Sequence, residues 1–405
     1  MARKKAENVE VNEMDEIFNE LVEECNGTLL EDLGPSKYYV DTGNLALNYI
    51  CAGKFINGGI PGSKITEIYG PPASSKSLIG MCILHGVQKM GGFAIFLDLE
   101  RAANRDFSVK AAHVNPKQLV VYEPDTIETS FLKIQNVIRR IREKKGSEVP
   151  IVLVYDSIGA VPCDREMRET NLPEGYTKAQ FEKIVGSKEK PGERARISGN
   201  ELRKINPILA RQNASLVIIN QTRQKLNVMF GKDIGGAGGG KALEFFGSCK
   251  LWVQPQKKIV KKLSEKLSVP LGVNVKIKNE KNRSFDPFWE TDNVQLYFNN
   301  GINPLGGLLG ILIKAERIKA VGAGSYLVEE PYAEGKEIKF RSSQERNDVP
   351  PSVLIDCPAL IDAKSKDEVE SYLTTFGSAI NLTDLEAVVE DEMSEEEMIG
   401  AITDE

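Results

Sequence analysis

Short apolar runs alternate with amphipathic stretches over most of the first 220 residues. The apolar and β-branched runs predict strands at 65–69, 93–97, 119–122, 151–155 and 215–219. The stretches between them have apolar positions spaced three and four apart, which predicts helices at 76–90, 104–113 and 196–212 and another that starts near residue 125. The run at 151–155 is apolar throughout, as a strand buried on both faces requires. This order predicts an α/β fold with a mainly parallel central sheet.

The helix near residue 125 has the most regular pattern. Its apolar positions are Ile127, Phe131, Ile134, Ile138 and Ile141. The acids at 125 and 128 are spaced as a capping box, so we expect the first to cap the helix.

Several segments depart from this alternation. Residues 1–35 are charged, and apolar positions at 14, 17, 18, 21 and 22 predict a helix that stays exposed unless it docks on something. Residues 163–195 are polar and charged, and residues 231–240 contain six glycines, so both are expected to be functional or disordered loops. Strands at 273–278 and 294–297 are expected to extend the sheet. We predict an N-terminal segment at 1–38, a core at 39–303, a small C-terminal α/β domain at 304–380 and a disordered tail at 381–405.

The composition is that of a soluble globular protein, with 41% hydrophobic and 27% charged residues in 405. We find no apolar run of roughly 20 residues to span a bilayer and no signal peptide. The six cysteines are scattered singly, which indicates reduced thiols in a cytoplasm. With only two histidines a histidine-based triad is nearly excluded, and Cys82 and His85 are expected to pack rather than bind metal.

Charge is unevenly distributed along the chain. The net charge is −6, yet residues 381–405 hold ten acids and no lysine or arginine, which leaves +4 on residues 1–380. An acidic tail on a mildly basic body is compatible with a nucleic-acid binder partly masked by its own tail. A solvated tail without such a role fits equally well.

Candidate chemistry starts at the end of the 65–69 strand. The segment that follows nearly matches the phosphate-binding loop G-x-x-x-x-G-K-[ST] between a strand and a helix. Ser75 occupies the position of the second glycine. Lys76 is expected to reach the β- and γ-phosphates, and the Ser77 hydroxyl to bind Mg²⁺. The predicted ATP-binding residues of the loop are Gly70, Pro71, Pro72, Ala73, Ser74, Ser75, Lys76 and Ser77.

Two further strands carry carboxylates at their ends. Asp156 follows the apolar run at 151–155, where a Mg²⁺-binding acid is wanted. Glu100 follows the 93–97 strand and is our candidate to activate the attacking water. A lysine with a serine, an aspartate and a glutamate at three strand ends predict a nucleoside triphosphatase.

From about Tyr39 to Tyr326 the chain resembles the RecA family of DNA strand-exchange recombinases. The order and spacing of the matching segments fit the bacterial recombinase more closely than the related hexameric helicases. The altered phosphate loop is similar to that of phage-encoded recombinases of the UvsX type. The segments are Asp41–Leu47, Gly59–Pro71, Phe96–Glu100, Val154–Ser157, Ile219–Arg223, Val228–Gly231, Gly239–Phe245 and Asn300–Asn303.

The resemblance implies roles around the nucleotide. Glu100 would activate the attacking water, and Gln221 would sense the γ-phosphate and relay its presence to the following loop. Phe107 would stack on adenine with Asn104 beside it. Lys278 and a second lysine would reach the ATP of the neighbouring subunit; Glu280 takes the gapless position of the second, and Lys281 follows it.

The resemblance also implies two DNA-binding loops, at about 163–195 and 224–241, and a subunit-interface position at Phe245. A glycine-rich loop with lysines and apolar tips suits single-stranded DNA, which is bound through its backbone and by stacking. A disordered glycine linker is the other interpretation of that loop. The implied DNA-binding residues are Arg196, Arg203, Arg223, Lys225, Leu226, Phe230, Gly239, Gly240 and Lys241.

We therefore expect a DNA-dependent ATPase that forms a helical filament on single-stranded DNA and exchanges it into homologous double-stranded DNA. ATP, Mg²⁺, single-strand-binding proteins and loader proteins are the expected ligands and partners. Two alternatives remain open: a ring-forming helicase or branch-migration motor, and a weakly catalytic DNA-binding filament or mediator with a degenerate phosphate loop.

Overall fold

The structure is a computed structural model that describes residues 2–25, 27, 29, 36–170, 192–222, 242–264, 267–333, 335, 337–342, 349–377 and 388–392. For residues 2–13, Phe107, 168–170, 262–264 and 388–392 the description covers the backbone alone. The chain divides into two compact units, Met1–Lys37 and Tyr38–Glu405. Each is described by itself.

The first unit is built on helix α1 (Ala2–Cys25), which confirms the helix predicted from the spacing of its apolar residues. Met14, Ile17, Phe18 and Leu21 form a stripe along α1, and each is 49–52% exposed. Residues 13–25 carry six acids and no base. Unit 1 thus presents an acidic helix with an exposed apolar stripe.

The second unit is organised on a sheet in the order β11-β10-β9-β8-β3-β7-β6-β4-β5, with β15 (Val388–Glu392) paired to β8. Neighbours from β8 through β3, β7, β6 and β4 to β5 are parallel, so their carboxyl ends meet at one edge. This confirms the predicted α/β fold with a mainly parallel sheet. The parallel strands are β3 (Ile65–Gly70), β4 (Phe93–Asp98), β5 (Leu119–Tyr122), β6 (Ile151–Asp156), β7 (Ala214–Gln221) and β8 (Gly247–Ser264).

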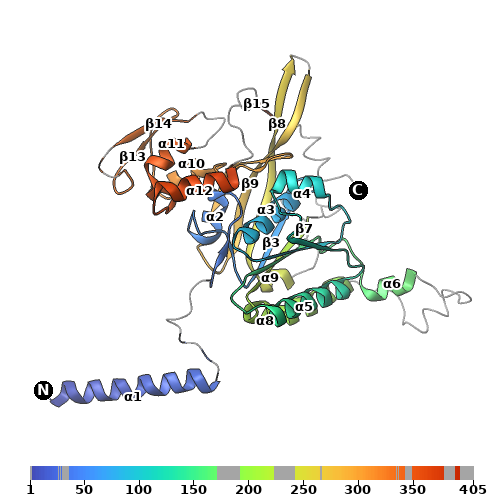
Figure 1. Ribbon diagram of the computed structural model, residues 1–405, viewed down its shortest axis with the longest axis vertical. Helices are drawn as coiled ribbons and strands as arrows, with labels where there is room; N and C mark the ends of the chain where they lie inside the picture. The colour runs from blue at the N-terminus through green and yellow to red at the C-terminus, as the bar shows by residue number, and fades with distance from the viewer. Residues whose placement is uncertain are drawn as a thin grey trace, which may run out of the picture. The chain divides into compact units, whose positions relative to one another are not determined.

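Beyond β8 the sheet is antiparallel and longer than predicted. β9 (Leu267–Asn282), β10 (Glu290–Tyr297) and β11 (Gly301–Ile302) follow in sequence order. The β8–β9 hairpin projects past the rest of the sheet in Figure 1. A separate two-stranded sheet pairs β1 (Tyr39–Val40) with β2 (Ile60–Pro61).

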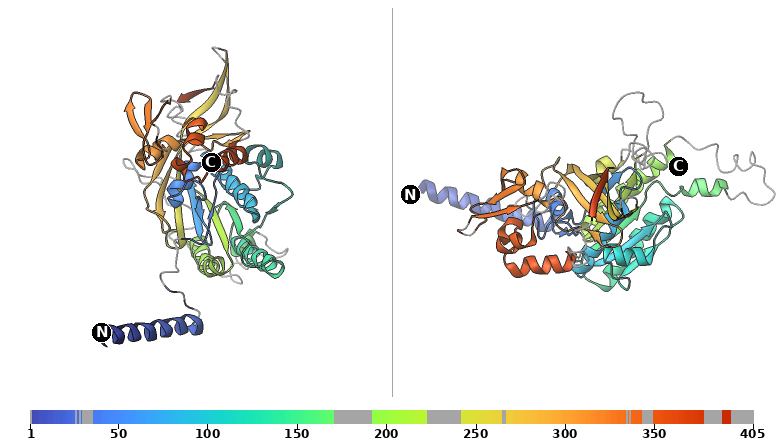
Figure 2. Two further views of the ribbon diagram at one scale, coloured as in Figure 1. Left: turned by 60° about the vertical axis from the view of Figure 1, so that its left-hand side comes forward. Right: turned by 90° about the horizontal axis from the view of Figure 1, so that it is seen from above.

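Helices cover both faces of the sheet (Figures 1 and 2). Because successive side chains of a strand point to opposite faces, Ile68 joins one core cluster and Ile65 the other. The first cluster includes residues of α2 (Leu45–Ala52), α3 (Lys76–Lys89) and α4 (Arg105–Ala112). The second includes α5 (Ile127–Lys144), α8 (Glu193–Arg211) and α9 (Ala242–Phe246).

The capping box of α5 differs from the prediction. Thr126 is the N-cap, and its hydroxyl accepts a hydrogen bond from the Thr129 backbone N–H. The acid at 125 instead pairs with Arg101, and Glu128 accepts from the backbone N–H of Asp164. The prediction was wrong because the helix starts one residue later and tertiary partners take both carboxylates.

Residues after Pro304 contribute to the first core cluster, where Leu312, Leu354 and Leu360 pack with residues of α2 and α3. The Tyr372 hydroxyl also donates to the half-buried Asp41 carboxylate at 3.2 Å. Burial raises the pKa of Asp41 to about 7. The boundary at 304 stays a prediction. The elements here are α10 (Leu308–Lys314), β12 (Lys319–Gly322), β13 (Ser325–Val328), β14 (Ile338–Arg341), α11 (Pro351–Asp356), the 3-10 helix Pro358–Ile361 and α12 (Lys366–Gly377).

The cysteines and histidines behave as structural residues. All six cysteines are free, and five are buried. His85 packs edge-on against Phe376, and burial lowers its pKa to about 4. Within the described ranges we find no group of residues able to hold a metal ion through three or more His, Cys, Asp or Glu side chains, and no helix suited to crossing a membrane.

Candidate nucleotide site

The loop between β3 and α3 lies at the carboxyl edge of the parallel strands. Gly70 ends β3 where a Cβ atom would come within 2.1 Å of the Val253 carbonyl oxygen, so only glycine fits this approach to β8. Six residues later Lys76 starts α3. The helix therefore directs its first backbone N–H groups toward the loop, as a phosphate site requires.

Lys76 is buried at the base of this loop. Its Nζ donates to the Pro71 carbonyl oxygen at 2.5 Å and to the Ser74 hydroxyl at 3.1 Å. Burial lowers the pKa of Lys76 to about 8, while the carboxylates of Asp156 and Glu100 act in the opposite direction. A further anion in the loop would favour the ammonium form in the same way.

Ser75 and Ala73 adopt left-handed backbone conformations, with φ of 58° and 55°. Side chains disfavour this region, which explains why a glycine suits the position of Ser75. We expect Ser75→Gly to raise the free energy of unfolding by about 1 kcal/mol relative to Ser75→Ala. Chemical denaturation of the two variants measures this difference, and equal stability would contradict the argument from φ.

Ser77 and Asp156 meet across the strand ends. The Ser77 hydroxyl donates to Asp156 Oδ2 at 2.5 Å. Burial raises the pKa of Asp156 to about 6, against the stabilising effect of the Ser77 hydrogen bond and of Lys76. A hydroxyl and a carboxylate are the oxygen ligands that Mg²⁺ takes beside phosphates, so this pair fits the predicted metal.

Glu100 lies beside them, two residues beyond β4. Two donors reach one oxygen of its carboxylate: the Ser157 hydroxyl at 2.6 Å and Gln221 Nε2 at 3.1 Å, both bonded to Oε1. The structure thus brings Lys76, Ser77, Asp156, Glu100 and Gln221 together from four strand ends. Ser157 was missed by the sequence reasoning, although it directly follows Asp156.

The remaining nucleotide candidates lie near α4. Asn104 precedes this helix, and its side-chain oxygen accepts from the backbone N–H of Asp106. Phe107 lies within α4, next to α3 in Figure 1, but its side chain is outside the described part. The stacking on adenine predicted for it stays a prediction.

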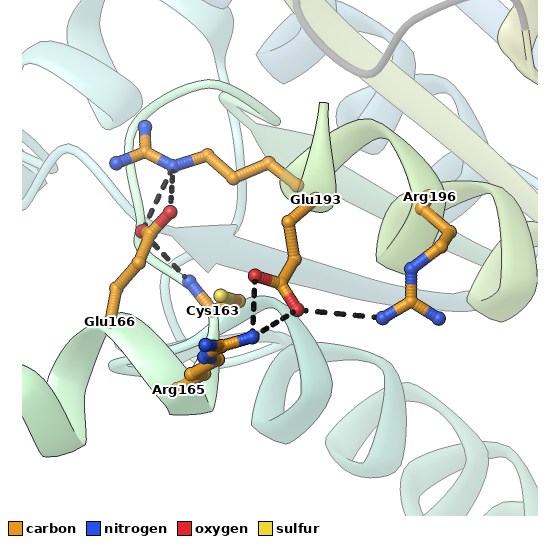
Figure 3. Close-up of polar contacts among 6 residues, drawn as sticks. Cys163, Arg165, Glu166, Glu193 and Arg196 are labelled. Carbon is orange, nitrogen blue, oxygen red and sulfur yellow. Dashed lines mark hydrogen bonds and ion pairs between the residues drawn. The ribbon is translucent and has the colours of Figure 1, made fainter. Parts of the chain in front are cut away.

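The first predicted DNA loop is described at both ends. α6 (Asp164–Thr170) follows Cys163, and α8 begins at Glu193. Arg165 pairs with Glu193 at 3.3 Å and Arg194 with Glu166 at 2.7 Å, which joins the two ends (Figure 3). Residues 171–191 of this loop lie outside the described residues.

Arg196 and Arg203 both project from α8 and are exposed. They are seven residues apart, about two helical turns, and so lie on one face. Arg196 contacts Glu193 at 3.5 Å (Figure 3), and its own side chain is exposed while that of Glu193 is mostly buried. The other predicted DNA-binding residues lie outside the described residues: Arg223, Lys225, Leu226, Phe230, Gly239, Gly240 and Lys241.

A β-bulge in β9 determines on which face of the sheet the two predicted interface lysines lie. Leu251 pairs with Asn279 and Lys250 with Lys281, so Glu280 is an extra residue in β9. The bulge places Lys281 on the same face as Lys278, which pairs with Trp252. Lys281 donates to the Glu244 carbonyl oxygen, and Glu280 accepts from the Tyr69 hydroxyl. Phe245 on α9 is 69% exposed.

Comparison with known proteins decides the family. Residues 36–303 match the family model of the RecA N-terminal domain, which is well over half of the chain. The chain belongs to the RecA family. Protein RecA of Thermus aquaticus is 31% identical over 307 residues, covering 76% of this chain and 81% of the relative. Protein RecA of Deinococcus radiodurans is 30% identical over 332 residues, covering 81% and 82%.

Membership of the RecA family confirms the resemblance predicted from the sequence motifs. The matched region contains the phosphate loop, both strand-end carboxylates and Gln221. It also includes both segments that were predicted to bind DNA. The α/β core described above is therefore the RecA core.

Proposed function

We propose that this chain is a DNA-dependent ATPase of the recombinase type, which assembles on single-stranded DNA and pairs it with homologous double-stranded DNA. The observation that carries the proposal is the meeting of Lys76, Asp156, Glu100 and Gln221 at one edge of the sheet in a RecA-family chain.

Each of these groups has a distinct task in ATP hydrolysis. Lys76 would leave the Pro71 carbonyl oxygen and bind the phosphates. Mg²⁺, held by Ser77 and Asp156, would neutralise phosphate charge. Glu100 would accept a proton from the attacking water, as a base within hydrogen-bond reach can.

Gln221 links this chemistry to DNA. It ends β7, three residues before the predicted DNA-binding loop at 224–241, and its side chain contacts the carboxylate of Glu100. A γ-phosphate that attracted Gln221 would change the start of that segment. ATP and DNA would then favour the same state, which is reciprocal coupling between two sites.

Self-association would use the stripe on α1. A groove of about 820 Å³ lies along β5, the edge strand of the sheet in the described part of the chain, where Val120 is 48% exposed. The groove is lined by apolar residues, among them Val120 and Val137, and by the bases Lys117, Lys133, Arg139 and Arg140. An acidic helix with an apolar stripe is complementary to such a groove in charge and in hydrophobicity. Docking of α1 on another copy is a heterologous contact, which gives an open helix when the rotation does not close.

A second contact would share ATP between subunits. Lys278 and Lys281 lie on one face of β9, and Lys281 donates to the carbonyl oxygen of Glu244, the residue before the exposed Phe245 on α9. We assign both lysines to the nucleotide of the neighbouring copy. This explains why nucleotide would stabilise the filament.

Because Ser75 replaces the second glycine of the phosphate loop, our proposal includes the chain among recombinases of the phage type. We propose that it acts in the cytoplasm, together with single-strand-binding and loader proteins. Electron microscopy with ATP and single-stranded DNA tests the mode of assembly. We expect open helical filaments. Closed hexameric rings would favour the helicase or branch-migration motor instead.

The acidic tail is expected to weaken DNA binding. β15 pairs antiparallel with the outer part of β8, so that Asp391 is opposite Lys258 and Glu392 opposite Lys257 in the register. Deleting 381–405 should therefore strengthen binding to single-stranded DNA, most at low salt because charge interactions are screened by salt. Fluorescence anisotropy across a salt series measures this. Equal affinities at every salt concentration would show that the tail has no masking role.

A further inference from the structure

One oxygen of the Glu100 carboxylate accepts hydrogen bonds from two donors, one buried and one exposed. Ser157 donates from the end of β6 and is 3% exposed. Gln221 donates from the end of β7 in an exposed hydrogen bond. Both bonds in the described part of the chain end on Oε1, so neither donor occupies Oε2.

The backbone fixes Ser157 from several sides. The carbonyl oxygen of Asp156 accepts from the Leu99 N–H at 2.7 Å, next to Glu100 itself. The N–H of Ile158 donates to the Ile219 carbonyl oxygen at 3.3 Å, and the Ser157 carbonyl oxygen accepts from Ala160 at 3.1 Å. These bonds join the ends of β4, β6 and β7.

We propose that Ser157 is a positioning residue for ATP hydrolysis, which holds Glu100 in place when Gln221 turns to the γ-phosphate. The proposal rests on the proposed function. The Gln221 amide has two N–H donors, but turning the side chain toward a γ-phosphate would move its nitrogen away from Glu100 and break the 3.1 Å bond. Once it leaves, the Ser157 hydroxyl is the donor that keeps Oε1 fixed and directs Oε2 toward the water.

The alternative is a purely structural role, in which Glu100 merely satisfies a buried serine hydroxyl. The two roles differ in what the loss of the hydroxyl changes. A structural serine would affect stability and nucleotide binding. A positioning serine would affect the turnover step, because a misplaced base loses catalysis without loss of ground-state binding.

The test compares Ser157→Ala with Ser157→Thr, which keeps the hydroxyl, and with Ser130→Ala, which removes a buried hydroxyl bonded to the Thr126 carbonyl oxygen instead. The measurements are kcat and KM for ATP in the presence of single-stranded DNA, ADP affinity and the thermal midpoint. We expect Ser157→Ala to lower kcat about tenfold to a hundredfold with KM unchanged. Ser157→Thr should restore most of kcat, and Ser130→Ala should keep it.

Glu100→Gln and the double variant separate this proposal from the proposed function. With Glu100 replaced, Ser157→Ala should cause little further loss, because the two residues act as one unit. If Glu100→Gln retained full ATP hydrolysis, the proposed function would be contradicted, because Glu100 would not be the base. If Glu100→Gln lost hydrolysis but Ser157→Ala did not, only the role of Ser157 would be overturned. The role of Ser157 would also be overturned if Ser157→Ala lowered ADP affinity and the thermal midpoint along with kcat, and Ser157→Thr did not restore them.

Discussion

Replacing Glu100 with glutamine is expected to lower kcat for DNA-stimulated ATP hydrolysis by about 10²–10⁴-fold, because glutamine cannot accept the proton of the attacking water. Glutamine keeps the shape of the side chain and can still accept from Ser157 through its amide oxygen. Nucleotide affinity should therefore change little. Steady-state kinetics with and without single-stranded DNA, together with ADP binding, measure both quantities.

Glu123→Gln is the matched control. Glu123 follows β5 at the same edge of the sheet, one strand beyond β4, and is exposed. Its replacement removes one negative charge near the site without touching the hydrogen bonds of Glu100. Comparable losses in both variants would mean that overall charge, and not a base at position 100, controls the rate.

The double variant Phe18→Glu with Leu21→Glu is expected to prevent self-association. Both side chains are 49% exposed on α1, and burying the exposed half of each contributes on the order of 1 kcal/mol, so their joint loss weakens each contact at least about tenfold. Sedimentation velocity at increasing protein concentration measures the loss. The complementary variant, Arg139→Glu with Arg140→Glu, should weaken assembly from the side of the groove.

Glu23→Gln on α1 is the control for these variants, because position 23 lies on the helix opposite the apolar stripe. It should assemble like the unaltered protein. If the stripe variant assembled normally while the groove variant did not, the groove would bind something other than α1. Normal assembly of both would refute the proposed contact.

The strands and the phosphate loop could be predicted because their signals are local. The 151–155 run is apolar at every position since β6 is buried on both faces, and Gly70 with Lys76 marks a turn into a helix. The capping box at 125–128 was wrong because two tertiary partners, Arg101 and Asp164, compete for its carboxylates. Local spacing says nothing about such partners.

The arrangement at Glu100 depends on strand register. β4 and β6 pair so that Asp98 is opposite Asp156, which places the residues after each strand within hydrogen-bond reach. A sequence pattern identifies Glu100 as a strand-end acid but does not specify that Ser157 donates to it. The bulge at Glu280 is of the same kind, since the lysine at 281 faces the same side as Lys278 only because one extra residue shifts the register.

ATP hydrolysis with and without single-stranded DNA tests most directly whether this RecA-family chain works as a DNA-dependent ATPase. We expect hydrolysis to be slow without DNA, to rise strongly when single-stranded DNA is added, and to disappear in Lys76→Ala under both conditions. Tight DNA binding with negligible hydrolysis that DNA does not stimulate, or DNA-stimulated hydrolysis that survives Lys76→Ala, would contradict it.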